Sequence, residues 1–300
     1  MPTCETLRTV QLVPITAFDR DLQLSLPPIR RHAKRMAEAG IRVFIPCAGS
    51  AEFHSLAADE IRLTLEAYRE SIGDESSIMA PTGHSVSVAL DLLRVAAEAT
   101  ANYGLVMPLN FPYLSDEGAR DYFRQLLDVS PIPLLIYKKG AVPSNELLLE
   151  LAGHENLVGV KYAVNDLDEF RQVVLADGGR VEWICGSAER YAPFFMLAGA
   201  TGYTSGAGNI CPRLTLAMHK AICDHDWDEA MDLQSIILPI EHYRARDGSS
   251  FNISMLKYAI THLGLDFGSP RPPQRTLTTE EMEEIDQLLP AIIAAEEQLE

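Results

Sequence analysis

Short apolar runs alternate with amphipathic stretches along most of the chain, and this alternation limits its possible folds more than any other feature. An apolar run predicts a buried strand, and apolar residues spaced three or four apart predict a helix. Strands are expected at 10–16, 41–47, 77–81, 104–108, 133–138, 158–161, 181–185 and 201–205. Helices are expected at 26–39, 59–71, 86–101, 116–128, after the N-cap residue Ser144, and at 167–175, 190–197 and 212–223.

About eight strand–helix units predict an α/β fold, a (β/α)₈ TIM barrel with its working residues at the carboxyl ends of the strands. The alternative is a doubly wound sheet, but neither GxGxxG nor GxxxxGK[ST] occurs. Helices without strands are expected at 227–243, 252–263 and 279–298, the last with an imperfect capping signal at Thr279, Met282 and Glu283. We therefore expect a barrel domain over residues 1–225 and a C-terminal helical extension, packed on it, over 226–300.

The composition excludes some classes of function. The formal net charge is −17, whereas nucleic-acid binding needs basic patches, so no nucleic-acid partner is expected. No apolar run reaches the length of a membrane helix, and Met1–Glu5 lack the features of a secretory signal, so we expect no membrane partner. The five cysteines form no CxxC pair, and we interpret them as reduced thiols of a cytoplasmic protein.

One predicted strand ends in a lysine. Leu157, Val158 and Val160 are the apolar residues expected in a buried strand, and Lys161 follows them. Removing an ammonium from water is costly and favours the neutral amine, which is the nucleophile that forms a Schiff base with a carbonyl. The alternative is a lysine at the end of a strand whose head group reaches solvent.

Two other strand ends carry groups that suit a carbonyl acid. Tyr137 is the last but one residue of the preceding strand, so its phenol is expected near Lys161, where it could shuttle a proton during imine formation. Gly49 and Ser50 follow the second strand and could bind a carboxylate through backbone N–H groups and a hydroxyl. Each of these features is also compatible with an ordinary strand end or turn. The eight histidines show no metal-ligand spacing and GxSxG is absent, so neither a metal nor a serine hydrolase is predicted.

These segments together resemble the dihydrodipicolinate synthase and N-acetylneuraminate lyase family of class I aldolases. The matching pieces are Gly49–Glu52, Ile136–Tyr137, Val158–Lys161 and Gly202–Asn209, in the family's order and spacing. The resemblance implies that Lys161 forms the Schiff base, that Tyr137 relays protons, and that Gly49, Ser50 and Thr204 bind substrate. It also implies a small-molecule 2-oxo acid substrate, no cofactor beyond the covalent imine, and a homodimer or homotetramer.

The departures from the synthase pattern concern the substrate. Val142 stands where the synthases have an arginine, and 109–113 lacks their tyrosine pair, which leaves Tyr113 as an open candidate for the relay. The segment around Glu52 looks more like the dehydratases of keto-deoxy sugar acids. We therefore expect a lyase acting on pyruvate or a keto-deoxy sugar acid, by aldol chemistry or dehydration, with 4-hydroxy-tetrahydrodipicolinate synthase as the alternative.

Two other interpretations stay open. One is a binding protein that keeps the pocket without turnover, and the other is a phosphate-binding barrel that uses Gly206–Gly208. Lys138 and Lys139, directly after Tyr137, could serve a distal acid group of the substrate or could simply be solvated. Because neighbouring strand residues point to opposite faces, at most one of these two lysines is expected to face the pocket.

Overall fold

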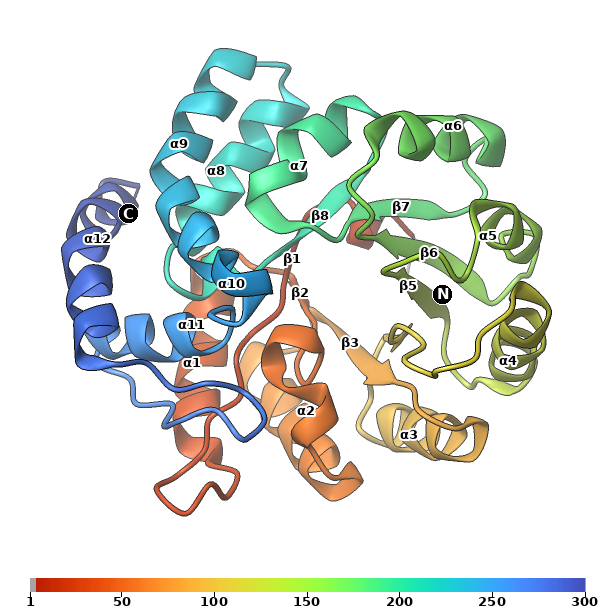
Figure 1. Ribbon diagram of the computed structural model, residues 1–300, viewed down its shortest axis with the longest axis horizontal. Coiled ribbons are helices and arrows are strands. Elements are labelled where there is room, and N and C mark those ends of the chain that lie inside the picture. The colour runs from red at the N-terminus through yellow and green to blue at the C-terminus, as the bar shows by residue number, and fades with distance from the viewer. Residues whose placement is uncertain (1–3, 300) are drawn as a thin grey trace.

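The computed structural model describes residues 4–299 and contains a closed barrel of eight parallel strands wrapped by helices (Figure 1). The predicted (β/α)₈ fold is confirmed. The strands are β1 Val10–Leu12, β2 Val43–Phe44, β3 Ser77–Thr82, β4 Tyr103–Val106, β5 Leu134–Lys138, β6 Leu157–Tyr162, β7 Glu182–Cys185 and β8 Gly202–Ser205. Their helices are α1 Leu26–Glu38, α2 Ala58–Ile72, α3 Val86–Glu98, α4 Asp116–Val129, α5 Asn145–Leu151, α6 Leu167–Asp177, α7 Ala188–Leu197 and α8 Pro212–Cys223.

The first two strands are shorter than the apolar runs that predicted them: β2 spans Val43–Phe44 of the run 41–47, and β1 ends at Leu12 because the chain leaves the ladder there. Pro14 has no N–H to donate, and the Ile15 N–H instead donates to Asn209 Oδ1 at 3.1 Å. Thr16 Oγ1 donates to the Ala51 carbonyl at 2.6 Å. These bonds join the loop after β1 to the segments that follow β8 and β2, so the apolar residues beyond Leu12 support the barrel mouth.

Side-chain caps define several helix starts. The predicted N-cap Ser144 accepts a hydrogen bond from the Leu147 N–H at 3.1 Å. The capping signal expected at Thr279 is misplaced by one residue. Thr278 is the N-cap, and its side chain and that of Glu281 exchange hydrogen bonds with each other's backbone N–H groups in a capping box.

Four helices follow the barrel: α9 Trp227–Arg244, α10 Arg246–Ser249, α11 Ser254–Ala259 and α12 Thr279–Glu297. α9 packs against α7 and α8, and α12 packs against α8 and α9, on one side of the barrel (Figure 1). The helix expected over 252–263 is shorter and ends in the 3-10 turn Ile260–Leu263. The chain bends sharply within α10, where Asp247 and Gly248 have positive φ. A division into domains at residue 225 stays a prediction.

The described residues also bear on two expectations from composition. Cys47, Cys185, Cys211 and Cys223 are free cysteines. Among the helices that residues 4–299 form, none combines the length and apolarity that crossing a membrane requires. Met1–Thr3, which contributed to the expectation that no secretory signal is present, lie outside the described residues.

Candidate active site

Lys161 is the penultimate residue of β6, at the carboxyl end of the barrel. The residue is only 5% exposed, and within 4–299 its ammonium has no carboxylate or hydrogen-bond partner. Burial lowers the pKa of Lys161 to about 7, and the positive charges of Lys139 and Arg244 also lower it. About half of the amine is therefore neutral and nucleophilic at pH 7.

Tyr137 lies beside Lys161 because the two residues are partners in the β5–β6 register. Lys161 Nζ sits over the aromatic ring, 4.2 Å from its centroid. Burial raises the pKa of the Tyr137 phenol to about 12, so the phenol keeps its proton at neutral pH and can donate it. The geometry thus pairs a neutral amine with a proton donor on the next strand.

A cavity of about 670 Å³ opens at this end of the barrel. Its lining includes the five residues to which the family resemblance gives a role, namely Gly49, Ser50, Tyr137, Lys161 and Thr204. Within an eight-stranded barrel, β2 lies opposite β6, so the turn with Gly49 and Ser50 faces the wall that carries Lys161. The cavity therefore has the Gly49–Ser50 turn on one wall and Lys161 on the opposite wall.

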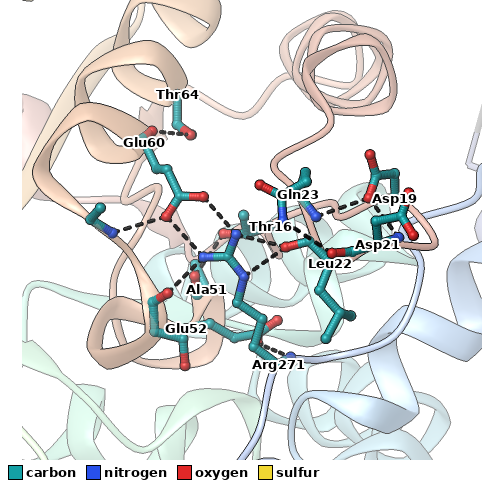
Figure 2. Close-up of polar contacts among 12 residues, drawn as sticks. Thr16, Asp19, Asp21, Leu22, Gln23, Ala51, Glu52, Glu60, Thr64 and Arg271 are labelled. Carbon is teal, nitrogen blue, oxygen red and sulfur yellow. Dashed lines mark hydrogen bonds and ion pairs between the residues drawn. The ribbon is translucent and has the colours of Figure 1, made fainter.

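The loop after β2 is held by residues near the C-terminus of the chain (Figure 2). Glu52 adopts a left-handed conformation, φ 67°, and its buried carboxylate forms an ion pair with Lys257 Nζ at 2.8 Å. The Arg271 backbone N–H donates to Glu52 Oε2 at 2.8 Å, and its guanidinium bonds Glu60 and the Leu22 carbonyl. This network fixes the turn that carries Gly49 and Ser50.

Thr204 is the third residue of β8 and is buried beside the cavity. Its hydroxyl donates to the Cys185 carbonyl at 3.3 Å, and its oxygen can still accept a hydrogen bond. After β8, the short turn Ala207–Asn209 is closed internally, because the Gly208 N–H donates to Ser205 Oγ at 2.8 Å. The Gly208 N–H is thus already bonded, and the Arg244 guanidinium covers Gly206. Both facts count against a phosphate site at Gly206–Gly208.

The C-terminal helices contribute a part of the cavity wall that the sequence patterns did not predict. Glu241, Arg244 and Asn252 all line the cavity. Arg244 is buried, pairs with Glu241, and donates to Asn252 Oδ1 at 2.5 Å, while Asn252 donates to Ser50 Oγ at 3.2 Å. The guanidinium lies directly on Gly206, where an added Cβ would come within 2.1 Å of Nη2. In the sequence, Gly206 is the sign of this contact, since any side chain at this position would collide with the Arg244 guanidinium.

The two lysines after Tyr137 point in different directions, as the strand geometry predicted. Lys138 is buried and donates to the carbonyls of Pro143 at 2.6 Å and Gly140 at 3.0 Å. Lys139 lines the cavity. Tyr113 does not line it; it is 95% exposed and belongs to a separate hollow beside α4. Within this chain Tyr113 therefore does not supply a relay for Lys161.

The described residues around the cavity do not form a set of metal ligands. Within residues 4–299, no three His, Cys, Asp or Glu side chains cluster as a metal ion would require. His54 lines the cavity, but its contacts are the rings of Phe53 and His84 and a 3.4 Å hydrogen bond with Asn110.

Comparison with known proteins agrees with this geometry. The profile of the Dihydrodipicolinate synthetase family matches residues 6–292. The chain belongs to this family. Among its relatives, the probable 5-dehydro-4-deoxyglucarate dehydratase 1 of Streptomyces avermitilis is 30% identical over 285 residues, covering 92% of this chain and 90% of that one. The corresponding protein of Streptomyces coelicolor is 28% identical, with the same two coverages.

Solved structures of the family superpose closely. Dihydrodipicolinate synthase from Bacillus clausii is 32% identical, with a TM-score of 0.93 over 96% of this chain and 98% of that one. A lysine mutant of sialic acid aldolase from Ruminococcus gnavus, 17% identical, has a TM-score of 0.91 over 100% of both chains and shows the shared fold. As a family member the chain is an enzyme, a Schiff-base-forming lyase, so the interpretation as a binding protein without turnover is not supported.

Proposed function

We propose that Lys161 is the Schiff-base nucleophile of this lyase and that the substrate is a keto-deoxy sugar acid, which loses water. The observation that carries the proposal is the buried Lys161 amine, which has no partner within 4–299, over the Tyr137 ring at the wall of the cavity. A lysine paired with a carboxylate would stay protonated, whereas this one is free to attack.

Imine formation uses both walls of the cavity. The backbone N–H groups at Gly49 and Ser50, with the Ser50 hydroxyl, bind the C1 carboxylate. The Lys161 amine then forms a bond to the C2 carbonyl carbon. Tyr137 transfers a proton to the resulting carbinolamine oxygen, which leaves as water, and the lysine nitrogen becomes a protonated imine. No organic cofactor is needed, because the imine itself withdraws electrons.

Dehydration follows from the same imine. Its positive charge acidifies the C3 hydrogen, and removal of that proton gives an enamine. The enamine electrons expel the C4 hydroxyl, which leaves with a proton as water, and the product is an unsaturated imine. Hydrolysis of this imine consumes one water and restores the Lys161 amine. Thr204 serves as a hydrogen-bonding group for the substrate on the β8 wall.

The choice of substrate rests on three observations. The relatives from Streptomyces are named 5-dehydro-4-deoxyglucarate dehydratases. The position of the synthases' arginine holds Val142, which cannot bind a second substrate's carboxylate. A cavity of about 670 Å³ accommodates a six-carbon acid.

Two related reactions share the enamine. Aldol cleavage would break the C3–C4 bond instead of the C4–O bond. Condensation of pyruvate with aspartate semialdehyde would make the enzyme a 4-hydroxy-tetrahydrodipicolinate synthase, and the observation that favours it is the 32% identity with the synthase from Bacillus clausii. Product analysis separates all three.

We also propose a homodimer or homotetramer in the cytoplasm. The basis for the assembly is the family resemblance, and sedimentation at 33.1 kDa alone would contradict it. The free cysteines support a reducing compartment. Fractionation of the source cells tests the location.

The test of the chemistry is borohydride trapping. The enzyme is incubated with pyruvate, aspartate semialdehyde plus pyruvate, N-acetylneuraminate, or keto-deoxy aldonates and aldarates, then reduced and mapped by mass spectrometry. We expect an adduct on Lys161 and none on neighbouring Lys138. The Lys161→Arg variant, which keeps the charge, should form no adduct and no product. Trapping elsewhere would refute the role of Lys161, and efficient condensation without dehydration of any sugar acid would restore the synthase.

A further inference from the structure

The cavity is lined by more positive than negative side chains, although the chain carries a net charge of −17. Besides Lys161, its charged lining consists of Lys139, Arg190, Arg244 and Glu241. Arg244 and Glu241 form an ion pair with each other. Lys139 and Arg190 have no hydrogen bond or ion pair from their side chains within residues 4–299. Two uncompensated cations thus face the cavity.

These two cations flank the strand that carries the nucleophile. Lys139 follows β5, two residues beyond Tyr137, and Arg190 lies in the first turn of α7, directly after β7. Both strands pair with β6. A step of two residues along a strand is about 7 Å, so Lys139 lies nearer the cavity mouth than Lys161. The carbon chain of a bound acid extends roughly 5 Å from C2 to C6, which brings its far end within reach of the long side chain of Lys139.

We infer that Lys139 and Arg190 bind the second carboxylate of a keto-deoxy aldarate and make the enzyme selective for dicarboxylic over monocarboxylic sugar acids. This inference rests on the proposed function, because it takes the substrate to be bound through Lys161 with its C1 carboxylate at Gly49 and Ser50. The inference concerns the other end of the substrate. The synthases bind a carboxylate there with an arginine, and this chain has Val142 at that position.

The other cations near the cavity are already occupied. Arg244 is held by Glu241 and Asn252 and lies flat on Gly206. The Lys138 ammonium is surrounded by backbone carbonyls. In contrast, the Arg190 guanidinium lies 5.3 Å from the centroid of the Tyr191 ring, and no hydrogen bond or ion pair within residues 4–299 occupies its N–H groups, which are therefore available for a carboxylate.

The experiment compares a keto-deoxy hexarate with the matching keto-deoxy hexonate, which ends in a hydroxymethyl group. Wild type, Lys139→Ala, Arg190→Ala and the double variant are assayed for kcat/KM on both acids. Arg94→Ala on α3 removes an equal charge outside the cavity and serves as the matched control. We expect the double variant to lose about tenfold more in kcat/KM for the hexarate than for the hexonate, with the extra loss mainly in KM. A loss shared by both acids reports the effect of Lys139 on the pKa of Lys161. Lys139→Arg should restore most of the hexarate preference lost in Lys139→Ala.

Ionic strength gives an independent readout. The hexarate KM of the wild type should rise with salt, and this dependence should weaken in the double variant. Equal losses on both acids, or an unchanged preference, overturn the inference. Where turnover is too slow to measure, half-saturation of borohydride trapping replaces KM. Equal half-saturation by the two acids in the wild type overturns the inference alone, whereas no trapping by either acid overturns the proposed function as well.

Discussion

Replacing Lys161 with methionine should stabilise the folded protein while abolishing its activity. The two side chains are similar in length, but the thioether carries no charge and suits a buried site. The wild-type amine is nearly inaccessible to water and has no hydrogen-bond acceptor among the described residues, so its protonated form is penalised in the fold. An active-site residue that lowers stability is a common consequence of function.

The pKa of Lys161 gives the size of the effect. Burial is the main reason that this pKa falls from its ordinary value of 10.5 to about 7. At about 1.4 kcal/mol for each unit, the amine costs about 4 kcal/mol of folding stability at pH 7, where half of it is neutral. We therefore expect Lys161→Met to raise the free energy of unfolding by about 4 kcal/mol at pH 7.

The pH dependence has a definite sign. The unfolded chain keeps the lysine proton up to pH 10.5, whereas the folded chain loses it near pH 7. Between these values the unfolded state binds more protons, so the wild type gains stability relative to the variant as the pH rises. The advantage of Lys161→Met should thus be largest at or below pH 7 and disappear near pH 10.5.

Urea denaturation of the wild type and the variant at several pH values measures this difference. Lys161→Arg, which keeps a charge that cannot be lost, serves as the control and should destabilise the protein at every pH. A Lys161→Met variant that is less stable than the wild type at pH 7, or a difference that does not change with pH, would refute the assignment of a buried, partly neutral amine.

Three further substitutions test other parts of the site. Tyr137→Phe should slow imine trapping about 100-fold, because the proton donor is lost, while stability changes little; rapid trapping would remove the phenol from the mechanism. Glu52→Gln leaves the Lys257 ammonium buried without its carboxylate and should cost about 3–5 kcal/mol in urea denaturation, whereas an unchanged midpoint would contradict the ion pair. Gly206→Ala should displace the Arg244 guanidinium and lower kcat/KM and stability, the latter by about 1–3 kcal/mol, and wild-type values of both would contradict the close contact.

The strands and the proximity of Tyr137 to Lys161 were accessible from the sequence because both depend on local patterns. Strands buried on both faces need continuous apolar runs, which is why β5 and β6 were predicted to within one residue at each end. Once Tyr137 and Lys161 were placed at the ends of consecutive strands, their proximity followed from strand spacing. The end of β1 was predicted less well, since hydrogen bonds to Asn209, far away in the sequence, decide where the ladder stops.

The C-terminal wall of the cavity could not be predicted in this way. Arg244 lies on a helix with no strand pattern, and its partner Asn252 bonds Ser50, which is 202 positions away. The packing of α9 against α7 and α8 brings these groups to the barrel mouth, and no periodicity in the helix reveals that placement. The sequence sign of the contact with Arg244 is Gly206, and a glycine after a strand is just as typical of an ordinary turn.

The arrangement of charge around Lys161 connects binding with reactivity. A carboxylate next to the amine would raise its pKa and hold it as an ammonium, which is not a nucleophile. Among the described residues that line the cavity, the acidic side chain is that of Glu241, which is paired with Arg244 instead. Lys139 lowers the pKa of Lys161 and also lines the cavity. In the function proposed above, the same positive charge both attracts the anionic substrate and keeps the Lys161 amine partly neutral, although the chain carries a net charge of −17.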